Sequence, residues 1–217
     1  MTGSWKEQGR GLFRPIAREL AKRGVMPDHL SVAGLCISLV AAMLLGRGAF
    51  LAAAFTLLLA SVFDMLDGDV ARERGVVSKF GAFLDSTLDR LSEGALYAGL
   101  AYFYFTRTRA ATVWMRGMFE GSAEWGDADG PTLGVLALAV MILSFMVSYT
   151  RARAEGLGME CKVGMMERPE RVLTLGAGAF LGHRYMPGVL GVLFILTLVT
   201  VLQRVYHVRK LTRTDTA

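Results

Sequence analysis

Four aspartates, regularly spaced between two apolar runs, are the residues most able to carry out chemistry. Asp64 and Asp67 are three residues apart, and Asp85 and Asp89 are four apart, so each pair lies on one face of a helix. A carboxylate at mid-bilayer costs roughly 2.5–3.5 kcal/mol, and like charges held close repel unless a cation intervenes. Carboxylate oxygens suit hard cations such as Mg²⁺ or Mn²⁺. The spacing therefore predicts a divalent-metal site between two helix ends, with a solvated acidic loop as the alternative.

The residues around these aspartates resemble the signature of a known family. The order D-x-x-D-G-x-x-A-R, eight residues, then G-x-x-x-D-x-x-x-D is similar to that of the CDP-alcohol phosphatidyltransferases. All eight fixed positions are met, at Asp64, Asp67, Gly68, Ala71, Arg72, Gly81, Asp85 and Asp89. The resemblance implies an all-α integral membrane enzyme with two metal ions per active site. Such an enzyme moves a phosphatidyl group from a CDP-linked lipid to an alcohol and releases CMP.

The resemblance also implies roles for the four carboxylates. Asp64, Asp67 and Asp85 are expected to bind the two ions, Mg²⁺ or Mn²⁺. Asp89 is expected to be the catalytic general base on the acceptor hydroxyl and to contact a metal as well. Two metals can clamp the attacking and leaving oxygens of a phosphoryl transfer, so little further covalent chemistry is required of the protein.

A second set of residues is expected to bind the CDP-linked donor. Gly68 and Gly81 lack side chains, so the nucleotide can approach the helix backbones. The planar fork of Arg72 suits the pyrophosphate oxygens, with a positive-inside anchor as the alternative reading. Ser78 is expected to donate to the nucleotide. The remaining two donor residues, Asp28 and Ser31, follow Pro27 in a stretch that reads as the cap of the first spanning helix.

The acceptor is expected to bind at two basic segments, residues 148–155 (S-Y-T-R-A-R-A-E) and 167–171 (E-R-P-E-R). Together these segments resemble the subgroup of the family that uses inositol 1-phosphate, the bacterial phosphatidylinositol phosphate synthases and their archaeal ether-lipid counterparts. A phosphorylated acceptor needs several guanidinium donors beside the metals. The candidates are Arg151, Arg168, Arg171 and Arg204. Pro169 should begin a helix that carries Glu170 and Arg171 in its first turn.

The elements that position these residues are predicted to be membrane helices. Hydrophobic residues make up 53% of the 217-residue chain and come in blocks, with a mean hydropathy of +0.41. We predict a single membrane domain over 1–217, with an amphipathic interfacial helix at 10–24, a six-helix bundle at 30–203 and a cytoplasmic tail at 204–217. The expected spans lie at about 30–46, 49–66, 82–105, 133–150, 172–186 and 187–203.

The distribution of Lys and Arg predicts the orientation of these spans. Most of the basic residues precede the first span, follow the last, or lie between spans two and three and between spans four and five. We therefore expect a multi-pass protein of the cell (plasma) membrane, with both termini and the active site facing the cytoplasm. The three arginines in the 106–132 loop run against this rule. The net charge of +5 fits an anionic bilayer surface, and no nucleic-acid motif accompanies it.

Three functions remain open from the sequence. The leading hypothesis is transfer of a phosphatidyl or archaetidyl group from CDP-diacylglycerol or CDP-archaeol to inositol 1-phosphate. A close alternative is transfer to glycerol 3-phosphate, as in a phosphatidylglycerophosphate synthase. An ion-coupled membrane transporter is an alternative of another class, because paired carboxylates also occur in transporters. A homodimer is implied by the resemblance alone.

Overall fold

The protein, described here from a computed structural model, is helical in all its regular elements over residues 15–115 and 130–214. Residues 15–22 form a short helix. Six longer helices follow: α2 (Pro27–Gly46), α3 (Phe50–Glu73), α4 (Lys79–Met115), α5 (Gly130–Gly156), α6 (Arg168–Leu181) and α7 (Met186–Thr214).

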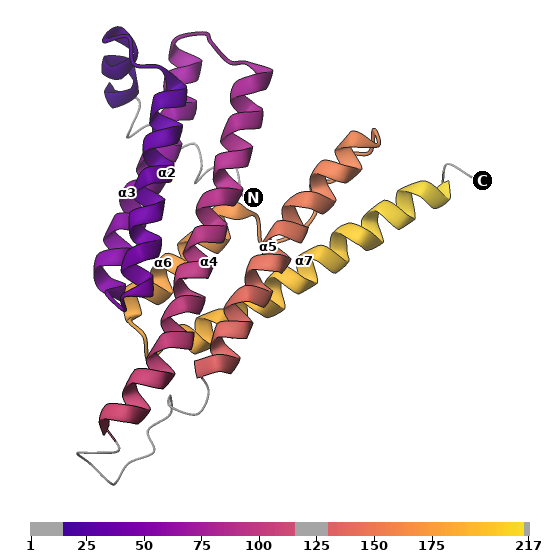
Figure 1. The fold of residues 1–217 in the computed structure, drawn as a ribbon. Coiled ribbons are helices and arrows are strands. Elements are labelled where there is room, and N and C mark those ends of the chain that lie inside the picture. The colour runs from indigo at the N-terminus through magenta and orange to yellow at the C-terminus, as the bar shows by residue number, and fades with distance from the viewer. Residues whose placement is uncertain (1–14, 116–129, 215–217) are drawn as a thin grey trace.

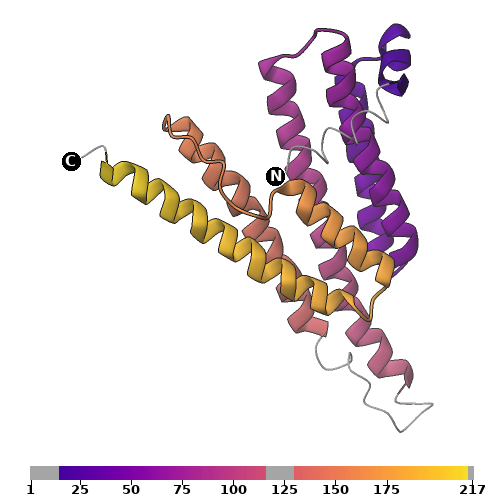
Figure 2. The same cartoon turned by 180° about the vertical axis from the view of Figure 1, so that it is seen from behind.

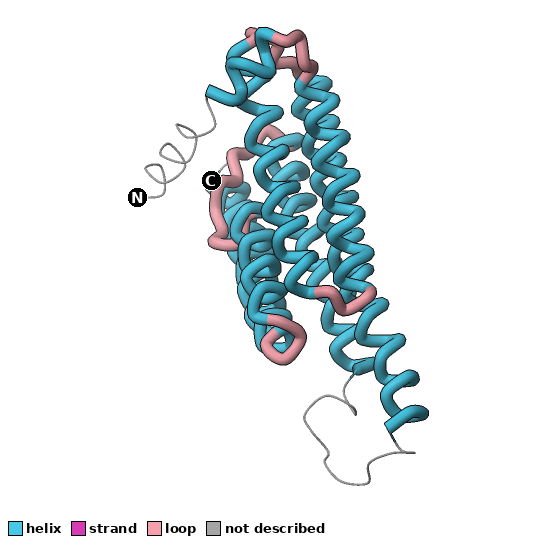
Figure 3. The backbone as a smooth tube through the Cα atoms, turned by 90° about the vertical axis from the view of Figure 1, so that its left-hand side faces the viewer, coloured by secondary structure: helices cyan, strands magenta, loops and turns pink. Residues whose placement is uncertain are grey.

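The helices form two groups that are inclined to each other (Figure 1). Helices α2, α3 and α4 pack together, and α5 and α7 lie side by side at an angle to them. Helix α6 lies between α3 and α7 and packs closely against both (Figure 2). Successive helices run in opposite directions (Figure 3). The first turns of α2, α4 and α6 therefore lie toward the same end of the bundle as the last turns of α3, α5 and α7.

Apolar side chains fill the interior and also cover much of the outside. Leu100, Val140 and Leu193 have no solvent-exposed surface, whereas Phe55 and Ile195 remain 58% and 59% exposed. Large exposed apolar side chains are expected where the surrounding solvent is lipid. Four of the described helices are long and apolar enough to cross a membrane, namely α2, α3, α5 and α7. The fold is that of an all-α membrane protein.

The structure places a helix at each of the six predicted apolar segments, but with different bounds. Helix α3 continues to Glu73, beyond the predicted end at residue 66, so the first aspartate pair is fully helical. Helix α4 begins at Lys79, where the Ser78 hydroxyl accepts a 2.9 Å hydrogen bond from the Gly81 amide. Helix α6 has only 14 residues, which is about 21 Å at 1.5 Å per residue.

The short N-terminal helix is terminated by Gly24, as the sequence predicted, two residues after its last helical residue. Gly24 has a φ of +79°, and the amides of Gly24 and Val25 bond back to the carbonyls of Ala21 and Leu20, as in a glycine-terminated helix. The Arg74 guanidinium at the end of α3 donates to the Gly24 and Val25 carbonyls at 3.0 and 2.7 Å. This helix is therefore fixed to the end of α3. Residues 10–14 of the predicted segment lie outside the described residues.

Two spanning helices, α2 and α4, approach each other most closely at a glycine. A Cβ atom at Gly99 of α4 would collide with the carbonyl oxygen of Ala42 in α2. Small residues permit such close contacts between membrane helices. The contact holds α2 against the helix that carries Asp85 and Asp89.

Candidate active site

Three carboxylates from two helices converge at one end of the bundle. Asp64 and Asp67 come from α3 and Asp85 from the second turn of α4, and one oxygen from each lies within 4.8 Å of the others. Asp67 is 7% exposed, and the other two are partly buried. A cluster of carboxylate oxygens at this separation fits a hard divalent cation, as the sequence predicted.

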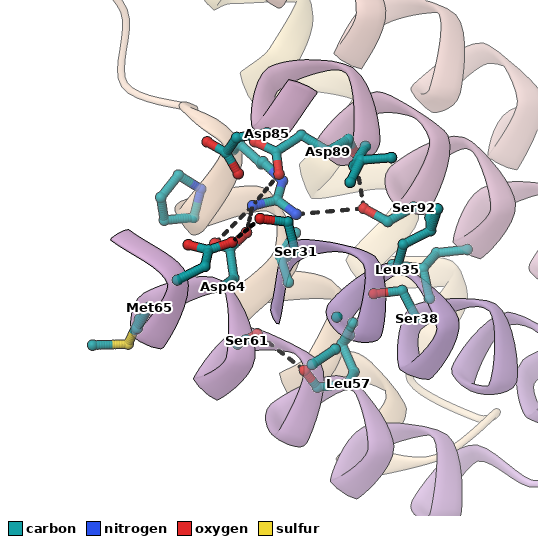
Figure 4. A pocket seen from close by; sticks show the side chains of 18 of the residues that line it. Ser31, Leu35, Ser38, Leu57, Ser61, Asp64, Met65, Asp85, Asp89 and Ser92 are labelled. Atoms are coloured by element: carbon teal, nitrogen blue, oxygen red, sulfur yellow. Dashed lines mark hydrogen bonds and ion pairs between the residues drawn. The ribbon is translucent and has the colours of Figure 1, made fainter. Parts of the chain in front are cut away.

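The fourth aspartate reaches this cluster through an arginine. Asp89 lies one turn after Asp85 on α4, and its Oδ1 is 2.9 Å from Nη1 of Arg168. The same Nη1 donates to both carboxylate oxygens of Asp64 at 2.9 Å. Asp64, Asp85, Asp89 and Ser92 are seen to point into the same pocket in Figure 4. The first residue of α6 thus neutralises part of the negative charge of α3 and α4.

Ser31 of α2 supports the buried carboxylate of Asp67 rather than capping its own helix. Its hydroxyl donates a 2.6 Å hydrogen bond to Asp67 Oδ2. The prediction of a side-chain cap at the start of α2 was wrong, because the N-cap is Met26 and no side-chain cap bond forms there. Pro27 does begin the helix, and Asp28 is exposed in its first turn.

A cavity of about 190 Å³ opens beside the carboxylates. Its polar end is lined by Ser31 and the four aspartates, together with Arg168. Its other end is lined by apolar side chains from four helices, namely Leu35, Leu57, Leu96 and Val172. A molecule with a charged head and an apolar tail matches this division.

The remaining donor candidates on α3 and at the start of α4 lie outside the cavity lining. Arg72 forms an ion pair with the buried Asp69, and its guanidinium nitrogens lie 3.5 Å from the position that a Cβ of Gly68 would take. Ser78 and Gly81 are joined by the cap bond at the start of α4. The structure therefore places Arg72 over the Gly68 backbone, in reach of a ligand that approaches there.

The four arginines predicted for the acceptor differ in their surroundings. Arg168 lines the cavity. Arg151 is partly exposed and pairs with Glu155 at 2.9 Å and Glu167 at 3.4 Å. Helix α6 begins at Arg168, one residue before the predicted start at Pro169, and carries Glu170 and Arg171 in its first turn as predicted.

The other two arginines are buried and bonded inside the protein. Arg171 is 1% exposed, and its Nε and Nη2 donate to the two oxygens of Glu93 at 2.6 and 2.8 Å. Arg204 is 2% exposed and donates to the carbonyls of Val163 and Val147. The structure thus brings Arg168 to the carboxylates and directs Arg171 and Arg204 to partners deeper in the bundle.

Sequence reasoning missed three polar residues that support the site. Glu93 pairs with Arg171, Asp69 pairs with Arg72, and the Ser92 hydroxyl accepts from Arg168 Nη2 at 3.4 Å. The signal for Asp69 was its i,i+3 spacing to Arg72, and that for Glu93 was its place one turn after Asp89 on an otherwise apolar face. The i,i+3 spacing identifies Arg72 as the partner of Asp69 on the same helix, but nothing in the local sequence identifies Arg171 as the partner of Glu93.

Comparisons with known proteins agree with this geometry. The family model described as CDP-alcohol phosphatidyltransferase matches residues 24–203. The chain is 36% identical to the phosphatidylinositol phosphate synthase of Mycobacteroides abscessus over 204 residues, which covers 91% of this chain and 84% of that protein. It is 35% identical to the archaetidylinositol phosphate synthase of Methanothermobacter thermautotrophicus, covering 90% and 92%.

A third relative, the phosphatidylinositol phosphate synthase of Mycobacterium tuberculosis, has been solved in several states. The crystal structure with CDP-DAG bound superposes with a TM-score of 0.74 at 30% identity and covers 90% of this chain and 92% of that one. The crystal structure in complex with manganese and citrate superposes with a TM-score of 0.72 at 32% identity, covering 89% and 87%.

Proposed function

Because the chain belongs to the CDP-alcohol phosphatidyltransferase family, we propose that it transfers a phosphatidyl or archaetidyl group from a CDP-linked lipid to inositol 1-phosphate. The products are phosphatidylinositol phosphate, or its archaeal counterpart, and CMP. The observation that carries this proposal is the meeting of Arg168, from the segment E-R-P-E-R, with Asp64 and Asp89. This contact brings the basic segment expected to bind the acceptor to the carboxylates of the family motif.

The reaction requires one bond to form and one to break at phosphorus. The acceptor hydroxyl forms a new P–O bond to the phosphate that carries the lipid, and the pyrophosphate P–O bond to CMP breaks. Asp89 accepts the proton of the attacking hydroxyl, because it lies beside Arg168 and is the one of the four aspartates outside the cluster of three carboxylates that would hold the ions. Asp64, Asp67 and Asp85 would hold the divalent ions, with Asp89 as a further ligand, and two such ions would stabilise the attacking and leaving oxygens.

The donor would lie across the ends of α2, α3 and α4. Gly68 and Gly81 leave room for the nucleotide at the helix backbones, and Arg72 pairs with the pyrophosphate. Asp28, Ser31 and Ser78 complete the predicted donor set. The structure of the M. tuberculosis relative with CDP-DAG bound supports a lipid donor of this type. Since the relatives include a phosphatidyl and an archaetidyl enzyme, both ester and ether lipids stay candidates.

The acceptor phosphate would meet guanidinium groups at the start of α6. Arg168 and Arg151 offer partly exposed head groups. Arg171 and Arg204 would donate to the acceptor phosphate from deeper positions. A guanidinium has five N–H groups, and the bonds of Arg171 to Glu93 and to the Met166 carbonyl use three of them. An acceptor without a phosphate group would offer these arginines no negatively charged partner.

The proposal includes the arrangement in the membrane. We propose six spans, with α4 and α6 as the two beyond the four clear candidates, forming one domain preceded by an interfacial helix. Most of the described basic residues lie at the end that carries the carboxylates, with Arg47 and Arg184 at the other end, which supports a cytoplasmic active site at the plasma membrane. We also propose a homodimer, as the family resemblance implies.

A direct assay separates the competing functions. Purified protein in detergent is given labelled CDP-diacylglycerol, Mg²⁺ and either inositol 1-phosphate or glycerol 3-phosphate, and lipid product and CMP are measured. Product with inositol phosphate is expected. Product formed only with glycerol 3-phosphate would show that glycerol 3-phosphate, and not inositol 1-phosphate, is the acceptor. Ion flux in vesicles without CMP release would support the transporter instead.

A further inference from the structure

Helices α4 and α6 are joined by long charged side chains. The backbones of α4 and α6 do not pack closely in the described part of the chain, although residues of both helices line the cavity. Arg168 reaches Asp89 from the first residue of α6, and Arg171 reaches Glu93 from the next turn. Both arginines project from α6, and both carboxylates lie one turn apart on α4. The two ion pairs therefore link the two helices, one turn apart on α4.

The pair of Glu93 with Arg171 is the deeper of the two. Their side chains are 3% and 1% exposed, and two parallel hydrogen bonds of 2.6 and 2.8 Å join them. Arg171 Nη1 also donates to the carbonyl of Met166 at 2.8 Å. The Met166 amide in turn donates to the hydroxyl of Thr200 on α7. Glu93 thus fixes a guanidinium that orders the end of the α5–α6 loop.

Stability alone does not account for this buried pair. Removing two charges from water offsets most of their attraction, so well-packed apolar residues would stabilise the bundle as well. A bidentate carboxylate, however, fixes the plane of a guanidinium, which an apolar neighbour cannot do. Orientation of Arg171 and of the first turn of α6 is the property that requires charge at position 93.

We propose that Glu93 is a positioning residue for binding of the phosphorylated acceptor, acting through Arg171 and through Arg168 one turn earlier. This inference rests on the proposed function, because it assumes an acceptor whose phosphate meets the start of α6. It assigns Glu93 no contact with the substrate or the metals. The donor, which meets α2, α3 and the start of α4, should be affected little.

Steady-state kinetics of Glu93→Gln in the purified full chain test the proposal. The amide keeps the shape and loses the charge, so we expect the KM for inositol 1-phosphate to rise about tenfold, while the KM for CDP-diacylglycerol changes less than about twofold. Glu93→Asp keeps the charge and should lie between Glu93→Gln and the wild type. Glu19→Gln, which removes an exposed ion pair with Arg23 in the N-terminal helix, is the matched control and should not change either KM.

The outcomes separate the inference from the function on which it rests. A folded Glu93→Gln protein with an unchanged acceptor KM, or with equal rises in both KM values, would overturn the role of Glu93. If Glu93→Gln does not fold, Glu93→Asp decides by the same ratio of KM values. Wild-type protein that uses only glycerol 3-phosphate would refute the inositol proposal, and the same kinetics with that acceptor would still test Glu93.

Discussion

The hydroxyl of Ser31 lies 2.6 Å from Oδ2 of Asp67, so the first turn of α2 supports a carboxylate of α3. A ligand carboxylate with a fixed neighbour keeps its lone pairs directed at the metal, and such outer partners typically change metal affinity by about 10–100-fold. We therefore expect Ser31 to support the proposed metal site through Asp67, as well as the proposed donor site.

Ser31→Ala should weaken metal binding. We expect the Mg²⁺ concentration for half-maximal activity to rise about tenfold, because Asp67 loses its oriented donor. The measurement is activity against Mg²⁺ at saturating substrates. Ser61→Ala is the control, since Ser61 lines the same cavity but donates to the Leu57 carbonyl. Equal effects of the two substitutions would contradict this reading of Ser31.

Asp89→Asn should abolish turnover and largely spare binding of the donor. An amide cannot accept the proton of the acceptor hydroxyl, so we expect a fall in kcat of about 100-fold or more. Binding of the CDP-lipid is followed separately by calorimetry on protein in detergent. A variant with a near-normal rate would remove Asp89 from the mechanism.

Arg72→Ala and Arg168→Ala should separate the two substrates. Loss of a charge-assisted hydrogen bond costs about 1.5–3 kcal/mol, or roughly 10–100-fold in the affected KM. We expect Arg72→Ala to raise the donor KM and Arg168→Ala to raise the acceptor KM. Kinetics with each substrate varied in turn check this. If both substitutions raised the KM of the same substrate, the assignment of Arg72 to the donor and Arg168 to the acceptor would be wrong.

Gly99→Ala should destabilise the bundle, although alanine is the better helix former. The added Cβ meets the Ala42 carbonyl, and overpacking of this kind costs about 1–3 kcal/mol. Gly191→Ala is the matched control: no atom lies within 4 Å of its added Cβ, so helix propensity alone should act, and stability should rise by up to about 1 kcal/mol. Thermal unfolding in detergent measures both. A Gly99→Ala protein as stable as Gly191→Ala would argue against the close contact.

Sequence patterns were sufficient for the helices and for the carboxylates. The spacing of Asp64, Asp67, Asp85 and Asp89 predicted a shared oxygen cluster, and the first three of them form it. The apolar blocks placed six helices. Both signals are periodic and local. The end of the N-terminal helix at Gly24 followed from the same local chemistry.

The sequence did not predict the partners of side chains that cross between helices. Nothing local connects Glu93 with Arg171, which lie 78 residues apart, or Ser31 with Asp67. The four basic residues expected to converge were therefore not separable: only the packing distinguishes Arg168, at the cavity, from the buried Arg204. The helix cap assigned to Ser31 failed for the same reason, since a serine near a helix start can also serve a neighbour.

The length of α6 has a consequence for how the two substrates meet. At about 21 Å, α6 is shorter than a hydrocarbon layer of about 30 Å. Arg168, its first residue, lies at the end that carries the carboxylates. We expect water to enter the membrane at that end of α6. We therefore expect the soluble sugar phosphate to reach the lipid donor within the membrane. The new headgroup would then be attached while the acyl or isoprenoid chains stay in the bilayer.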